Sequence, residues 1–127
     1  MGKSQEVITR MRQIVADYSY IVGWSLVTRD GVSTVSHLEA HIDDQLVGAV
    51  AAAVLSIGDK WSEDRDDCPV EYVLMGHCDR RTIFLPAGKD GALVLLLRPQ
   101  GDWNQIVAAA CTLADEFGRL LDAPRQA

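Results

Sequence analysis

The sequence predicts an α/β (α+β) fold with a five-stranded antiparallel sheet and the element order α-β-β-α-β-β-β-α. Three segments have apolar residues at helical spacing, and five short segments between turn residues have the pattern of β-strands. The connections are short, which favours antiparallel neighbours. The last strand is apolar at every position from Ala92 to Leu97, as expected for burial on both faces, so helices should cover both sides of the sheet.

The first and the last helix are each apolar on one side only. They are expected over residues 3–18 and 103–121. In the first, the apolar positions share an arc of about 120° at 100° per residue. In the last, the apolar residues also share one arc, while Thr112 and Asp115 face away from it. If these two helices share one face of the sheet, the middle helix takes the other face alone.

The five strands are expected over residues 21–28, 32–36, 70–75, 82–86 and 92–98. In the first of them, Trp24 and Leu26 lie on one face, and Ser25 and Val27 lie on the other. The Asp-Gly pair at residues 30–31 suits the positive φ angles of a two-residue hairpin turn, so the first two strands should form a hairpin.

The middle helix, expected over residues 44–63 with Asp43 or Asp44 as its cap, is the most informative segment. Its apolar residues spread over about 180°, which is wider than the stripe that a surface helix needs. The remaining side carries mostly small residues, Gly48, Ala49, Ala52 and Ser56, which leave little to obstruct a neighbour. Because one sheet face cannot cover so wide an apolar surface, we expect a second copy of the chain to cover the rest.

Net charge and cysteine content indicate which classes of partner and which cellular compartment to expect. The formal net charge of −6 argues against nucleic acid or an anionic membrane as the main partner. The acidic run at residues 63–67 is interpreted as a solvated loop. Three cysteines without a C-x-x-C spacing indicate a reducing compartment, and the polar first twenty residues do not resemble a signal peptide. We therefore expect a cytoplasmic location and no membrane insertion.

Several polar residues were weighed as chemical sites. His37 and His41, with His77 and the cysteines, have a spacing that could bind a metal, but their segment has no regular period and exposed loop histidines are the better interpretation. Cys78 lies near arginines but lacks a separate residue to orient a base. A single exposed arginine such as Arg29 is more often solvated than a finger on a nucleotide. The sequence thus predicts no catalytic, metal or cofactor site.

The chain resembles the Roadblock family, which includes dynein light chains and bacterial MglB-like domains. The resemblance rests on "VGWSLVTRDGVS" as the first hairpin, on "DQLVGAVAAAVLSIGDKW" as the middle helix, and on "VEYVLM" and "RRTIFLPAGKDGALVLLLRP" before the closing helix. It covers residues 7–121 and implies a single domain over residues 1–127 with flexible termini. It also implies a profilin/longin-like arrangement, with two helices on one face of the sheet and one on the other.

The resemblance implies a function as well. Roadblock-family proteins are homodimeric scaffolds and regulators of Ras-like small GTPases; the bacterial ones act on an MglA-like partner, and those that are GTPase-activating arrange the GTPase's own residues. Dimers form through the middle helix and the third strand. The expected dimer and partner interface is therefore Leu46, Val47, Val50, Val54, Ile57, Trp61, Val70 and Tyr72. The alternative is a small-molecule-sensing PAS/profilin-like module, which would need an internal pocket with convergent polar groups.

Overall fold

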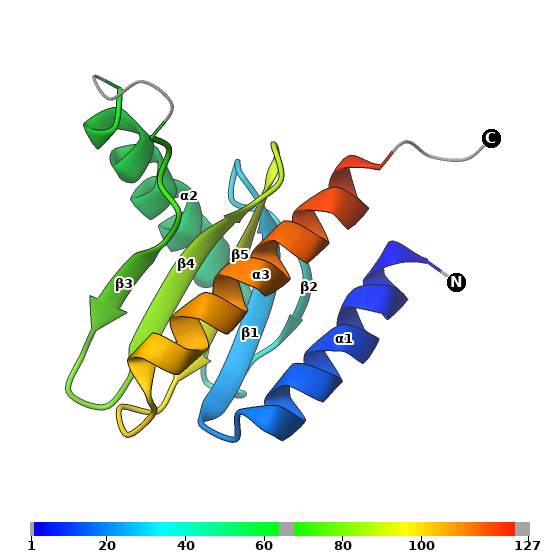
Figure 1. Cartoon of the computed structure of the whole chain (residues 1–127), viewed down its shortest axis with the longest axis vertical. Coiled ribbons are helices and arrows are strands. Elements are labelled where there is room, and N and C mark those ends of the chain that lie inside the picture. Colours follow the sequence, from blue (N-terminus) through cyan, green and yellow to red (C-terminus); the bar gives the residue numbers. More distant parts are fainter. Residues whose placement is uncertain (1, 64–67, 124–127) are drawn as a thin grey trace.

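The computed structural model describes residues 2–63 and 68–123. The elements are α1 (Lys3–Asp17), β1 (Ile21–Thr28), β2 (Ser33–His37), α2 (Asp44–Trp61), β3 (Val73–Gly76), β4 (Arg81–Ala87), β5 (Gly91–Leu97) and α3 (Trp103–Asp122). This order confirms the predicted one. Figure 1 shows the three layers: α1 and α3 lie on one face of the sheet, and α2 lies on the other.

The sheet has the strand order β2-β1-β5-β4-β3, and all of its neighbouring strands are antiparallel. The apolar strand β5 is at the centre, and every residue of it is buried. Its side chains alternate between the two faces, as the pleat of a strand requires. Leu93, Leu95 and Leu97 belong to the core beneath α1 and α3. Ala92, Val94 and Leu96 belong to the core beneath α2. The prediction of a central strand buried on both faces is confirmed.

α1 and α3 cover their face of the sheet with one-sided apolar stripes, as predicted. From α1 the buried residues are Val7, Met11 and Ile14. From α3 they are Ile106, Ala110, Leu113, Ala114 and Phe117. Both sets share a core with Trp24 and Leu26 of β1, which confirms the face assigned to these two residues. Val27 packs on the opposite face, beneath α2.

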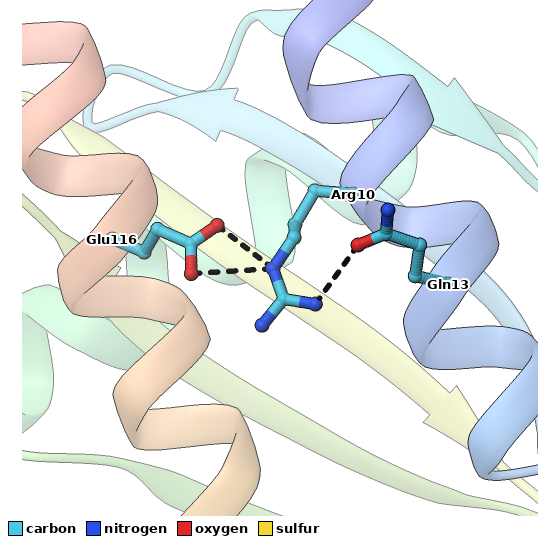
Figure 2. A network of polar contacts seen from close by, with 3 residues as sticks. All are labelled: Arg10, Gln13 and Glu116. Carbon is cyan, nitrogen blue, oxygen red and sulfur yellow. Dashed lines mark hydrogen bonds and ion pairs between the residues drawn. The ribbon is translucent and has the colours of Figure 1, made fainter.

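A polar network also joins α1 to α3 at the surface (Figure 2). The Arg10 Nε donates to both carboxylate oxygens of Glu116, at 3.2 and 2.9 Å, and its Nη1 donates to the Gln13 Oε1 at 3.2 Å. The Arg10 and Glu116 side chains are each more than a third exposed. Solvent therefore screens this ion pair, and its contribution to stability should stay below about 1 kcal/mol.

The first hairpin differs from its prediction at the turn. Residues 29–32 form a four-residue connection in place of the predicted two-residue turn, and β2 covers Ser33–His37 in place of residues 32–36. The cause is local hydrogen bonding: the Val32 N–H donates to the Thr28 Oγ1 at 3.0 Å, and the register shifts at Leu26/Val27 in a bulge. Gly31 has φ +94°, so the predicted need for a positive φ at this glycine is confirmed.

The third strand is shorter than predicted, because β3 begins at Val73 and not at Val70. Its register pairs Val73 with Phe84. Continued backwards, that register would set residue 71 opposite Pro86, which has no N–H to donate to a neighbouring strand. Val70 instead packs against α2, where its Cγ2 lies 2.8 Å from the position that a Cβ on Gly58 would occupy. Residues 64–67 of the acidic run and the chain ends at residues 1 and 124–127 lie outside the described residues.

Candidate functional site

α2 begins at an aspartate cap and buries one side against the sheet. The Asp43 Oδ1 accepts a hydrogen bond from the Gln45 N–H at 3.0 Å, which satisfies one of the free donors of the first turn. The buried positions are Gly48, Ala51 and Leu55. Ala51 and Leu55 pack in the core formed with Val27, Phe84 and Val94. The buried side of α2 is therefore narrow, and its residues are fully packed within the fold.

The small side of α2 has a close neighbour, which the sequence did not predict. A Cβ added to Gly48 would overlap the carbonyl oxygen of Gly31 in the first hairpin turn, so backbone packs on backbone here. About three turns further along α2, the Arg29 guanidinium forms an ion pair with the Asp59 carboxylate. The small residues on this side do leave room for a neighbour, since the absence of a side chain on Gly48 is what lets the hairpin approach. The hairpin thereby fixes the position of α2.

A row of apolar side chains runs along the opposite side of α2. It consists of Leu46, Val50, Ala53, Ile57 and Trp61, and we call it the α2 row. At 100° per residue these positions lie within an arc of about 80°, and the centre of that arc points about 150° away from the buried side. Leu46, Ile57 and Trp61 are 61%, 70% and 83% exposed. Most of the α2 row therefore faces solvent, with only Val50 packing partly against the core, and among the described residues no other helix or strand lies over it.

An apolar groove lies beside the C-terminal half of the α2 row. It is bounded by Val54, Ile57, Gly58, Trp61 and Ser62 of α2 with its cap, and by Val70, Tyr72, Val73 and Met75 of the segment entering β3. We call it the α2–β3 groove; its volume is about 490 Å³. Among the residues that the structure describes, no charged side chain lines it. A surface of this composition is suited to an apolar protein partner.

The groove is continuous with an open sheet edge. β3 pairs only with β4, so its outer edge has no partner strand among the described residues. Tyr72 and Leu74, which lie before and within this edge strand, are both partly exposed, at 42% and 43%. An unpaired edge flanked by apolar side chains favours pairing with another chain.

The eight predicted interface residues fall into two groups by exposure. Leu46, Ile57, Trp61 and Tyr72 are exposed. Val50 and Val54 are half-buried, and Val47 and Val70 are also half-buried, because all four pack partly on the core beneath α2. The sequence analysis missed Ala53 in the α2 row and Val73, Leu74 and Met75 at the edge. Helical spacing marks Ala53, but an alanine carries too little apolar surface to be noticed.

The polar residues weighed as chemical sites are scattered. Arg29 is engaged by Asp59 and so is not a free cation. Cys68 and Cys78 are exposed free thiols. Within residues 2–63 and 68–123 there is no cluster of three or more His, Cys, Asp or Glu side chains that could hold a metal ion. The arrangement around α2 is suited to binding a protein and offers no assembled set of reacting groups.

The two groups with a shifted pKa, Tyr20 and Cys111, are not part of the α2 row. Burial, followed by the nearby Glu71 and Asp115 carboxylates, raises the pKa of the Cys111 thiol. Burial, followed by Tyr18 and Asp102, raises the pKa of the Tyr20 phenol. Both shifts favour the neutral form of the group. A thiol with a raised pKa is a poorer nucleophile at neutral pH, so Cys111 has the character of a structural cysteine.

None of the helices described is long and apolar enough to cross a membrane.

Comparisons with known proteins identify the fold. No family model and no curated protein matches the sequence. Solved structures do match: a Roadblock/LC7 domain from Streptomyces avermitilis superposes with a TM-score of 0.78 at 17% identity, over 88% of this chain and 94% of that one. A structure titled "MglB with tetrameric arrangement" superposes with a TM-score of 0.80 at 9% identity, over 94% of this chain and 90% of that one. This chain has the Roadblock/LC7 fold.

A profilin also matches this fold, with a lower TM-score. LokiProfilin1 superposes with a TM-score of 0.54 at 13% identity, over 92% of this chain and 98% of that one. The predicted profilin/longin-like fold class is therefore confirmed. At these identities the likeness describes the arrangement of the backbone, and the functional argument rests on the surfaces described above.

Proposed function

We propose that this protein is a non-enzymatic homodimer that regulates or scaffolds a Ras-like small GTPase. The observation that carries the proposal is the α2 row, an exposed apolar surface on a helix whose buried side is already filled. The shared Roadblock/LC7 fold supports it, and so does the MglB structure, whose tetrameric arrangement associates this architecture with assembly.

The α2 row supports a two-fold contact in particular. In such a contact the same patch of both copies meets itself, so one row of five positions along a helix is sufficient to build the interface. Antiparallel packing of two α2 helices would bring the half-buried Val50 and Val54 into the same contact. Ser56 and Lys60, on the flank of α2 away from the groove, would remain in water.

The α2–β3 groove and the open edge of β3 extend this interface. Trp61 is 83% exposed and lies at the end of the groove, where a partner could cover its ring. Large aromatic side chains contribute strongly to interfaces when they enter a partner's pocket. We therefore place Val70 and Tyr72, two of the eight residues predicted from the sequence, in the interface.

A GTPase partner is proposed from the fold resemblance, with an MglA-like protein as the expected class. The pair of α2 helices would give it a rigid platform, and the chain itself would supply no reacting group. The acidic overall balance, with a net charge of −6, favours a GTPase surface that carries lysine and arginine.

The functional half is tested by presenting the purified chain to the Ras-like GTPases of its source organism, each loaded with GDP or with a non-hydrolysable GTP analogue. We expect one of them to bind in one nucleotide state and its hydrolysis or exchange rate to change. An Ile57→Asp chain, which loses the dimer platform, should bind less well than a Ser56→Asp chain, whose charge lies off the row. Binding to no GTPase in either state would refute the GTPase function while leaving the dimer intact.

A further inference from the structure

A second groove lies on the other side of the sheet, between α1 and the edge strand β2. We call it the α1–β2 groove; its volume is about 510 Å³. Its apolar floor consists of Ile8, Met11, Val15 and Trp24. Its polar lining consists of Arg12, Ser36 and His37. This volume lies within the range of about 300–1,000 Å³ that is typical of small-molecule sites in proteins.

The fold brings these residues together from three elements. Ile8, Arg12 and Val15 occupy positions i, i+4 and i+7 of α1 and so line up along one side of the helix. At about 1.5 Å per residue they span about 10 Å, which is close to the length of a medium alkyl chain. Trp24 and His37 are cross-strand partners on β1 and β2, so the imidazole stands beside the indole. The groove thus has an elongated apolar floor with polar groups on it.

The polar groups of the groove have no partners among the described residues. The side chains of Arg12, Ser36 and His37 make no hydrogen bond or ion pair within that part of the chain. Arg10, two residues before Arg12, differs in being turned towards α3, where Glu116 holds it (Figure 2). The Arg12 guanidinium is therefore a positive charge beside an apolar floor, and no carboxylate within residues 2–63 and 68–123 forms an ion pair with it.

Three other grooves lack this combination. The α2–β3 groove has no charged side chain among its described lining residues. The groove at the end of α3 is lined by the Asp115 and Asp122 carboxylates as well as by Arg119. The groove beside Cys111 is lined by Glu71 and Asp115, which would repel an anion. The α1–β2 groove is the one of these four that pairs an unneutralised cation with an apolar surface.

We propose that the α1–β2 groove binds a small amphiphilic carboxylate with an unbranched apolar tail. The planar fork of the Arg12 guanidinium matches a carboxylate, which can accept two parallel hydrogen bonds from it. The Ser36 hydroxyl and the His37 ring are placed to donate further hydrogen bonds. The tail lies along Ile8 and Val15 over the Trp24 indole, which removes apolar surface of both molecules from water. This site is separate from the α2 row and does not depend on a GTPase partner.

The proposal is tested with decanoate as the probe and the full chain as the protein, by titration calorimetry and native mass spectrometry. We expect saturable binding of one decanoate per chain. Octanoate should bind about 4- to 15-fold more weakly, since two methylene groups are removed from a half-open apolar groove. Decyltrimethylammonium, which has the same tail and the opposite charge, should not compete. An absence of saturable decanoate binding, or equal affinity for the two head groups, would overturn the proposal.

Two variants locate the site. Arg12→Gln should weaken decanoate binding about tenfold or more, because a charge-assisted hydrogen bond is lost. Arg119→Gln, which removes an exposed arginine on α3, should leave the affinity unchanged. Both positions are exposed, so the variants should fold, and matched thermal unfolding curves verify this. In amide and indole spectra, decanoate should shift the signals of Trp24 and His37. Equal effects of the two variants, or shifts at Trp61 in place of Trp24, would contradict the assignment.

Discussion

Replacing Ile57 by aspartate is the sharpest perturbation of the proposed dimer. Ile57 is 70% exposed in the single chain, so a charge there costs the isolated fold little. Complete burial of an isoleucine side chain is worth about 1.5–3 kcal/mol, and seven-tenths of that remains to be gained on association. Each copy therefore contributes about 1–2 kcal/mol through this residue, and a symmetric dimer contains two copies.

The expected loss is thus about 2–4 kcal/mol per dimer, which corresponds to a dissociation constant about 30-fold to a thousandfold larger. Burial of an uncompensated carboxylate would add to the loss. Sedimentation velocity over a concentration series measures the constant for wild type, for Ile57→Asp, and for the control Ser56→Asp. Equal weakening by both variants, or no weakening by Ile57→Asp, would refute the assignment of the α2 row. Val54 would be a poorer site for this test, because it is half-buried on the core and a charge there would also destabilise the monomer.

Three further predictions concern the fold itself. Gly48→Ala should lower the free energy of unfolding by about 1–3 kcal/mol in a urea titration at fixed protein concentration, because the added methyl group overlaps the Gly31 carbonyl; unchanged or higher stability would show that the hairpin is not packed against α2. The Cys111 thiol should react with iodoacetamide at neutral pH more slowly than the two exposed cysteines, since burial raises its pKa and lowers its thiolate fraction. Mass spectrometry of peptides measures the three rates, and equal rates would contradict this prediction. Arg10→Gln should change the free energy of unfolding by less than about 1 kcal/mol, because the ion pair with Glu116 is screened; a loss above about 2 kcal/mol would mean that the pair is more than a surface contact.

The layer arrangement could be predicted because strong periodicity carries it. The uninterrupted apolar run of β5 required a helix layer on both faces, and the one-sided stripes of α1 and α3 distinguished them from α2. Each of these signals extends over a whole element. It therefore survives errors of one or two residues at the ends of elements.

The ends of β2 and β3 depended on interactions that periodicity does not reveal. The hydrogen bond from the Val32 N–H to the Thr28 hydroxyl lengthened the hairpin turn by two residues. Val70 alternates with its neighbours as a strand residue would, but it packs on Gly58 of α2, and this contact is visible only in three dimensions. Strand propensity does not define where an edge strand begins or ends, because edge residues have few neighbouring residues that specify their conformation.

The candidate site could be predicted in part, because the apolar pattern of α2 extends over the whole helix. The excess apolar width of α2 indicated an interface, and Leu46, Ile57 and Trp61 are indeed exposed. The width alone could not show which residues face the sheet and which face solvent, so half-buried Val47 was grouped with exposed Leu46. The role of Gly48 was missed because a glycine in a helix usually marks weak structure, whereas here it marks the place where another backbone comes close.

The central claim is that the α2 row is an interface between two copies of this chain. The most direct measurement is the mass of the wild-type protein in solution at micromolar concentration, by light scattering during size-exclusion chromatography. The chain has a mass of 13.9 kDa. The account predicts a dimer of about twice that mass that persists on dilution to low micromolar concentration, as expected for a large apolar contact. A mass that stays at 13.9 kDa across the concentration range would contradict it.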